Sequence, residues 1–104
     1  MRFGLDDKYL DELTAILRSI PEIEEAVIYG SRARGDYRRA SDIDLSLRGP
    51  RLEDRHVVRL KTLLYESRIP YFVDVNIFHR LRNPQFIANI ERDGIVCYRR
   101  ETQD

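Results

Sequence analysis

The chain has 104 residues, and its 18 basic and 18 acidic side chains give a formal net charge of zero. This length predicts a single domain spanning residues 1–104, with no room for a second substrate-binding domain. The zero net charge argues against direct nucleic-acid binding, because no global attraction to phosphate is expected. No apolar run approaches the ~20 residues of a membrane span, and the first residues contain no apolar signal-peptide region. We therefore expect a cytoplasmic protein without membrane association.

Helices and strands are predicted to alternate along the chain. The predicted order is helix 6–20, strand 25–29, short helix 31–35, strand 42–48, helix 52–67, strand 71–78, a short helix between Asn83 and Gly94, and strand 95–98. Apolar residues recur at helical spacing in the two long helices and at every second position in the strands over 42–48 and 71–78. Asn83 before Pro84 is a typical helix start, and Gly94 is a typical helix end. This order indicates the α/β (α+β) class.

Two acids lie in the strand predicted over 42–48. Asp42 and Asp44 are two residues apart, so both side chains project from one face of the strand, while the apolar residues between them point into the core. Neighbouring carboxylates repel each other unless a cation, a proton or hydrogen bonds offset the repulsion. Because Mg²⁺ prefers oxygen ligands, the pair is a candidate metal site.

A third acid, Asp74, lies inside the apolar strand predicted over 71–78. A charge on an otherwise largely apolar face is costly without a partner. We therefore expect Asp74 to lie beside Asp42 and Asp44 and to complete a site of three carboxylates.

A glycine turn follows the strand predicted over 25–29. Its first residues are Gly30, Ser31 and Arg32. Backbone N–H groups at a glycine turn that leads into a helix attract phosphate. Arginine also suits bidentate contacts with phosphate. These three residues are therefore candidate nucleotide-binding residues.

The run Gly30-Ser31-Arg32-Ala33-Arg34-Gly35, followed by Ser41-Asp42-Ile43-Asp44-Leu45, resembles the signature of minimal nucleotidyltransferase (MNT) domains of the DNA polymerase β-like superfamily. The resemblance covers about residues 8–98 and includes Asp74 as a lone acid on a neighbouring strand. It implies the polymerase β-like palm, a small mixed β-sheet with helices packed on one side. It also implies that the three acids hold Mg²⁺, as two ions, and that the glycine turn holds the phosphates of ATP.

Stand-alone MNT proteins often pair with a small helical HEPN-domain protein as a toxin–antitoxin system. The resemblance therefore implies that this chain transfers AMP from ATP to a hydroxyl, that of a tyrosine, on a HEPN ribonuclease toxin and acts as its antitoxin. Two alternatives stay open. The chain could be a non-catalytic antitoxin that masks the HEPN partner, or a nucleotidyltransferase that acts on a small molecule such as an aminoglycoside. An adjacent reading frame that encodes a HEPN protein would separate the first two readings from the third.

Overall fold

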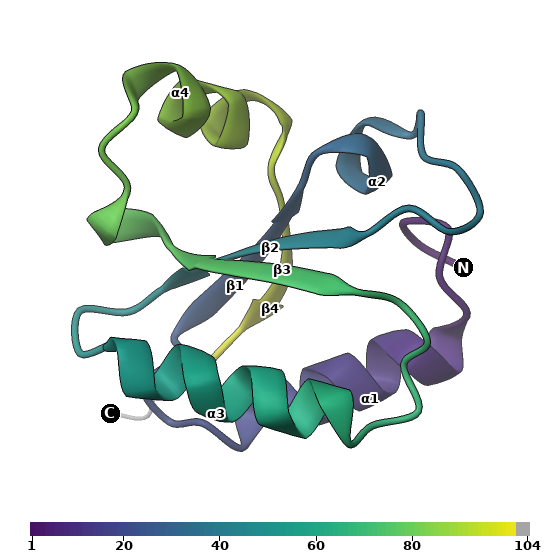
Figure 1. Cartoon of the computed structure of the whole chain (residues 1–104), viewed down its shortest axis with the longest axis horizontal. Helices are drawn as coiled ribbons and strands as arrows, with labels where there is room; N and C mark the ends of the chain where they lie inside the picture. The colour runs from purple at the N-terminus through teal and green to yellow at the C-terminus, as the bar shows by residue number, and fades with distance from the viewer. Residues whose placement is uncertain (102–104) are drawn as a thin grey trace.

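A computed structural model describes residues 1–101 of the chain (Figure 1). Its elements are α1 (Asp7–Arg18), β1 (Glu25–Tyr29), α2 (Ser31–Arg34), β2 (Ile43–Arg48), α3 (Asp54–Tyr65), β3 (Val73–Ile77), the 3₁₀ helix η1 (Phe78–Arg80), α4 (Pro84–Asp93) and β4 (Ile95–Arg99). The predicted order is confirmed, with η1 as an additional short element. No helix within residues 1–101 is long and apolar enough to cross a membrane.

The strands form one mixed sheet in the order β3-β2-β1-β4. Strand β1 is antiparallel to both of its neighbours, whereas β2 and β3 are parallel. The register pairs Tyr29 with Asp44 across β1 and β2, and Asp44 with Asp74 across β2 and β3. Because paired residues of neighbouring strands lie on the same face, this register forms one row of three polar side chains.

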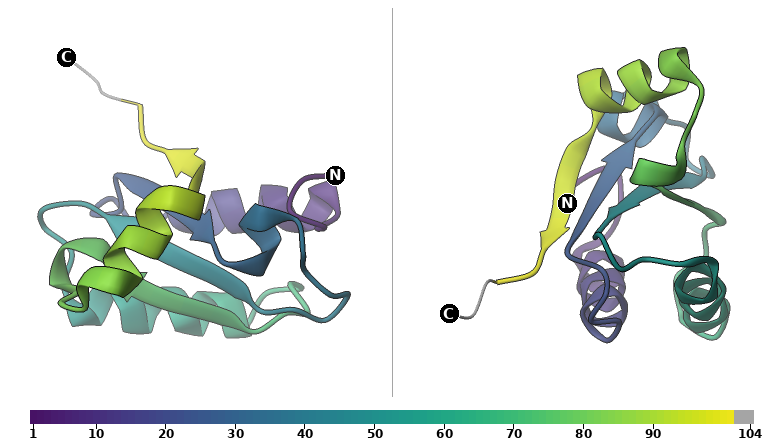
Figure 2. Two further views of the ribbon diagram at one scale, coloured as in Figure 1. Left: turned by 90° about the horizontal axis from the view of Figure 1, so that it is seen from above. Right: turned by 90° about the vertical axis from the view of Figure 1, so that its left-hand side faces the viewer.

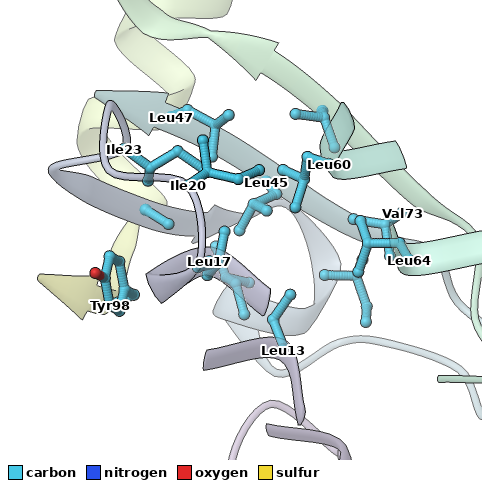
Figure 3. Packing of buried hydrophobic residues seen from close by; sticks show 14 of the residues in the cluster. Leu13, Leu17, Ile20, Ile23, Leu45, Leu47, Leu60, Leu64, Val73 and Tyr98 are labelled. Atoms are coloured by element: carbon cyan, nitrogen blue, oxygen red, sulfur yellow. The ribbon is translucent and has the colours of Figure 1, made fainter. Parts of the chain in front are cut away.

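Helices α1 and α3 pack against the other face of the sheet and enclose the core (Figures 1 and 3). Alternation along β2 sends Ile43, Leu45 and Leu47 into this core, where none is more than 1% exposed. Leu17 of α1 and Leu60 of α3 meet them from the helices and are fully buried. Burying a leucine or isoleucine side chain contributes about 1.5–3 kcal/mol. Because burial of these three side chains fixes one face of β2 against the helices, Asp44 must project from the opposite face of the strand.

Helix α4 lies on the opposite side of the sheet from α1 and α3 (Figure 2, right). It begins as predicted, since the Asn83 side chain accepts a hydrogen bond from the N–H of Phe86. The Phe86 ring packs edge-on against Tyr29, with 5.7 Å between centroids. The prediction that the helices pack on one side of the sheet is therefore confirmed for the two long helices, α1 and α3. It is not confirmed for α4, which packs on the face that carries the acids and covers apolar residues of β1.

Candidate active site

Asp44 and Asp74 lie side by side at paired positions of β2 and β3. Asp42 immediately precedes β2 and is exposed, while Asp44 is half-buried. Burial, followed by the charges of Asp74 and then Asp42, raises the pKa of the Asp44 carboxyl. The expectation that the three acids share one face is consistent with this mutual influence. The expectation that Asp74 needs a partner because it lies on an apolar, buried face was wrong, however. Its face of β3 is open to solvent, and neighbouring Phe72 is 67% exposed.

The glycine turn touches the acids directly. Gly30 follows β1 with φ 73° and ψ −154°, a conformation that only glycine adopts readily. A Cβ atom at Gly30 would overlap the Asp44 Oδ2 atom. Ser31 then begins the short helix α2, beside the same carboxylate. The turn can therefore approach the Asp44 carboxylate this closely only because residue 30 is a glycine and has no side chain.

The available donors at this site are carboxylate oxygens on an open face, which suits Mg²⁺. Among residues 1–101, no group of three or more His, Cys, Asp or Glu side chains is placed to hold a metal ion. Mg²⁺ is commonly held by one or two carboxylates together with substrate phosphates, so an open arrangement fits this ion. The convergence of Asp42, Asp44 and Asp74 on one ion stays a prediction.

Arg32 does not face the site, contrary to the sequence prediction. Its side chain is 2% exposed. The guanidinium donates from Nε to the Ser41 carbonyl at 2.9 Å, from Nη1 to the Phe3 carbonyl at 2.9 Å, and from Nη2 to the Arg39 carbonyl at 3.4 Å. It also lies 4.5 Å from the centroid of the Tyr71 ring. Since its donors are directed to backbone carbonyls, Arg32 joins the loop before β2 to the N-terminal segment and is not available to phosphate.

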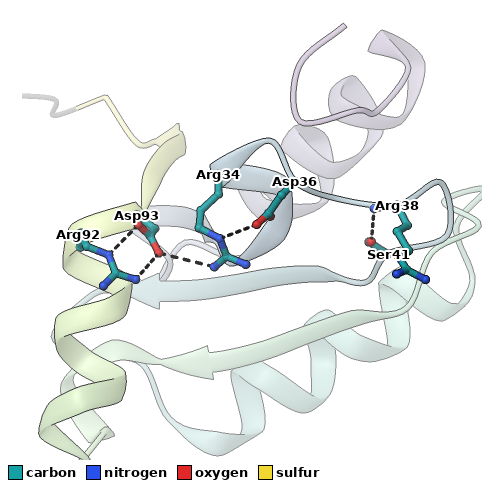
Figure 4. Close-up of polar contacts among 6 residues, drawn as sticks. All are labelled: Arg34, Asp36, Arg38, Ser41, Arg92 and Asp93. Carbon is teal, nitrogen blue, oxygen red and sulfur yellow. Dashed lines mark hydrogen bonds and ion pairs between the residues drawn. The ribbon is translucent and has the colours of Figure 1, made fainter.

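A basic side chain that does lie near the acids is that of Arg34, two residues further along α2. Its charge opposes the rise in the Asp44 pKa. Arg34 also pairs with Asp36 at 3.3 Å and with Asp93, at the end of α4, at 3.6 Å (Figure 4). Asp93 in turn accepts two hydrogen bonds from Arg92, both at 2.9 Å. Nothing in the local sequence could reveal this link, because Asp93 is brought to α2 only by the fold.

A hydrogen-bonded chain of neutral side chains crosses the same face of the sheet. Ser46 Oγ donates to Asn76 Oδ1 at 2.7 Å, and Asn76 Nδ2 donates to Tyr29 Oη at 2.9 Å. The three residues come from three adjacent strands and lie beside Asp44 and Asp74. Sequence reasoning assigned no role to them, although the alternation of β2 and β3 places Ser46 and Asn76 on the acidic face.

A family model described as polymerase beta nucleotidyltransferase matches residues 11–103. The chain belongs to this family. It is therefore a nucleotidyltransferase, as the resemblance of its glycine turn and acid pair implied.

Solved structures share the fold of this nucleotidyltransferase. A crystal structure of a toxin–antitoxin with AMP-PNP is similar with a TM-score of 0.71 and 18% identity, over 88% of this chain and 74% of that chain. Two mutants of the toxin–antitoxin MntA-HpeT are similar with TM-scores of 0.69 and 0.64 and identities of 15% and 18%, over 88% of this chain and 74% and 71% of those chains. No curated protein sequence matches this chain. At these identities the similarity shows the fold alone.

Repulsion among the acids of this nucleotidyltransferase should be measurable as a pH-dependent loss of stability. The pKa of Asp44 is raised in the folded state, so folding favours its protonated form, and stability falls as the pH rises through the interval between the unfolded and folded pKa values. Asp44→Asn should therefore raise the melting temperature at pH 7 in metal-free buffer, because it removes both the cost of burying the charge and its repulsion by Asp74 and Asp42. The gain should vanish below about pH 4, where the wild-type carboxyl is itself protonated. Calorimetry from pH 3 to 8 measures this difference.

The control for this measurement is Asp11→Asn, which neutralises an exposed acid on α1. It should leave the melting temperature nearly unchanged across the same pH range. A melting temperature for Asp44→Asn that equals the wild-type value at pH 7 would contradict the repulsion among the acids.

Proposed function

We propose that this chain, as a single domain spanning residues 1–104, transfers AMP from ATP to a tyrosine hydroxyl of a HEPN ribonuclease toxin and so acts as its antitoxin. The observation that carries the proposal is that Asp44 packs against the Gly30 turn and is paired with Asp74 on the neighbouring strand. This arrangement offers anionic oxygens for metal ions next to a glycine turn that suits phosphate. The shared fold with toxin–antitoxin structures, one of them with AMP-PNP, supports the choice of partner and nucleotide.

Each site residue has a distinct role in this proposal. Asp42 and Asp44 hold Mg²⁺, and Asp74 completes the second of two ion sites. When bound, these ions supply positive charge that stabilises the transferred phosphoryl group. The Asp74 carboxylate accepts the proton of the acceptor hydroxyl, and the N–H groups that follow Gly30, together with the Ser31 hydroxyl, hold the terminal phosphates. Pyrophosphate is the leaving group.

A protein acceptor suits an exposed apolar surface at the β3 edge of the sheet. Phe72, two residues before Asp74, is 67% exposed, and Tyr65 at the end of α3 is 92% exposed. A groove of about 440 Å³ runs along these two side chains and over Ile69, between α3 and the start of β3, and none of the site residues lines it. A protein bound in this groove would have to extend around the β3 edge to cover the reacting groups, where it would exclude water and orient its hydroxyl. The cytoplasm, which supplies ATP and Mg²⁺, is the compartment in which we place the reaction.

The test measures the partner's intact mass and its RNA cleavage in parallel, after incubation with this chain, ATP and Mg²⁺. The wild type should add the mass of AMP to the HEPN partner and block RNA cleavage. Asp42→Ala/Asp44→Ala should add no mass and leave cleavage intact, because the metal ligands have been removed. The matched control, Asp11→Ala/Glu91→Ala, removes two exposed acids from α1 and α4 and should behave as the wild type.

Two outcomes would overturn parts of the proposal. If the double variant at Asp42 and Asp44 still silences the ribonuclease at equal stoichiometry and no mass is added in either reaction, the chain is a masking antitoxin and not an AMP transferase. If the wild type neither modifies nor inhibits the HEPN partner but transfers AMP to an aminoglycoside, the acceptor is a small molecule.

A further inference from the structure

Strand β3 forms one edge of the sheet, with β2 on one side and no strand on the other. The N–H of Ile43 donates to the carbonyl of Phe72 at 2.9 Å. Because the backbone groups of successive residues alternate between the two sides of a strand, those of Val73 and Val75 are directed away from β2. Among residues 1–101, no other segment forms a backbone hydrogen bond with them. The edge of β3 therefore offers free backbone donors and acceptors at strand spacing.

Two grooves lie along this edge, one at each end of β3. The first is the groove of about 440 Å³, which is lined by Val73 and by Tyr65 of α3. The second has a volume of about 200 Å³ and is lined by Val75 and by Val57 of α3. Both valines of β3 belong to the core that α3 covers, whereas Asp74 between them is exposed (Figure 1). The edge thus carries a groove, an acid and a second groove at three successive residues, on alternate faces of the sheet.

A polypeptide strand added to β3 would match this spacing. Side chains directly opposite each other on adjacent strands share a face, and successive side chains of one strand point to opposite faces. A residue opposite Asp74 would therefore lie on the face that carries the acids. The residues immediately before and after it would lie opposite Val73 and Val75 and would point toward the two grooves. Apolar side chains suit these two positions, because both grooves are lined by apolar residues of β3 and α3.

We propose that the acceptor protein binds through an extended segment that adds to β3 as a fifth strand, with its tyrosine opposite Asp74 and an apolar residue on each side of that tyrosine. The inference rests on the proposed function, which supplies the tyrosine and the role of Asp74. Backbone hydrogen bonds to β3 hold the segment, and the two grooves select its side chains. The added strand brings the acceptor hydroxyl to the acids from the β3 edge, so one segment occupies the grooves and reaches the reacting groups.

The charges along this edge favour a segment of another protein over a second copy of this chain. Among the described residues that line the first groove, Lys61 alone carries a charge, and it is exposed. In the second groove Arg80 pairs with Asp54 at 2.7 Å, so its two charges offset each other. The free cation at Lys61 suits an acidic residue near the apolar end of the segment. A second copy paired through its own β3 would instead place two Asp74 carboxylates on one face of adjacent strands, where they repel each other.

Residue-resolved amide hydrogen exchange tests the added strand without altering the protein. The chain is compared alone and saturated with the HEPN partner, in the absence of ATP. In the free chain the amides of Val73 and Val75 should exchange faster than the amide of Asp74, which is directed to β2. On binding, exchange at Val73 and Val75 should slow by roughly tenfold or more, because their N–H groups become hydrogen-bonded. Exchange in β4 (Ile95–Arg99), at the other edge of the sheet, should not change.

A pair of variants tests the first groove separately. Phe72 lines this groove and is 67% exposed, whereas Val58 of α3 is 64% exposed and lines neither groove. Phe72→Ser should weaken binding of the HEPN partner by roughly tenfold or more, because aromatic side chains buried at an interface carry much of the binding energy. Val58→Ser should bind the partner as the wild type does. Both substitutions replace exposed side chains, so both variants should keep the fold.

The outcomes separate this inference from the proposed function. If the partner binds and receives AMP while exchange at Val73 and Val75 stays the same, the added strand is wrong and the proposed function stands. If these amides become protected but no AMP is transferred, the docking is supported and the proposed function fails. If Phe72→Ser binds the partner as tightly as the wild type, the first groove does not hold the segment and that part of the inference is wrong.

Two further results would overturn the inference as a whole. If the amides of Val73 and Val75 are already protected in the free chain and lose this protection on dilution, a second copy of the chain occupies the edge. If the HEPN partner does not bind at all, both the inference and the proposed function are overturned.

Discussion

Gly30→Ala should lower AMP transfer by roughly a hundredfold or more, because a methyl group at this position would occupy the space of the Asp44 Oδ2 atom. A displacement of about 1 Å at a reacting site can cost this much activity. The backbone adds a second effect, since φ is 73° at Gly30 and an alanine there is strained by about 1–3 kcal/mol. The Asp44 carboxylate must therefore move, or the turn must change its conformation. The rate of AMP transfer and the Mn²⁺-dependent rise in melting temperature both measure this effect.

Gly35 provides the matched control for this experiment, because it lies at the other end of the same short helix. Its φ is 91° and its ψ is 2°, in the left-handed region, so Gly35→Ala also carries backbone strain, although less than at Gly30. No atom lies within 4 Å of the position that its Cβ would occupy. Gly35→Ala should therefore lower stability without loss of metal-dependent stabilisation. Equal losses of transfer activity in the two variants would show that strain in α2, and not contact with Asp44, causes the effect.

Arg32→Ala should lower the free energy of unfolding by about 3 kcal/mol. The substitution leaves the partly buried carbonyl groups of Phe3, Arg39 and Ser41 without their donor, and each of them costs up to about 1–3 kcal/mol where water does not replace the guanidinium. For a chain of this size the melting temperature should fall by roughly 10–20 °C. Thermal and urea unfolding measure this loss directly.

The control for Arg32 is Arg38→Ala in the loop that follows α2. The Arg38 side chain is exposed, and the hydrogen bond of this residue to Ser41 Oγ comes from its backbone N–H, which alanine retains (Figure 4). Its effect on unfolding should stay within about 0.5 kcal/mol. Folded Arg32→Ala at low temperature should still bind ATP, because Arg32 faces the protein interior. If Arg32→Ala unfolds with the same free energy as the wild type but binds ATP more weakly, Arg32 has the phosphate-binding role that the sequence predicted.

The order of helices and strands and the face shared by Asp44 and Asp74 were predictable from the sequence, and the mixed sheet was implied by the family resemblance. Alternation in 42–48 and 71–78 places every second side chain on one face, and the apolar residues of each strand identify the face that is buried. The proximity of the glycine turn to Asp44 agrees with the resemblance of the motif. Local patterns are sufficient here because the covalent geometry of a strand determines which residues share a face.

The roles of the arginines required the tertiary structure. Arg32 and Arg34 are two residues apart in one basic run, yet Arg32 is buried among carbonyl groups and Arg34 lies near Asp44. No local pattern distinguishes them, because α2 has only four residues and its packing against distant segments decides which guanidinium turns inward. The same holds for the chain from Ser46 through Asn76 to Tyr29, which depends on the register of three strands. Sequence patterns therefore predicted the acids and the turn as candidates, whereas long-range packing decided which side chains surround them.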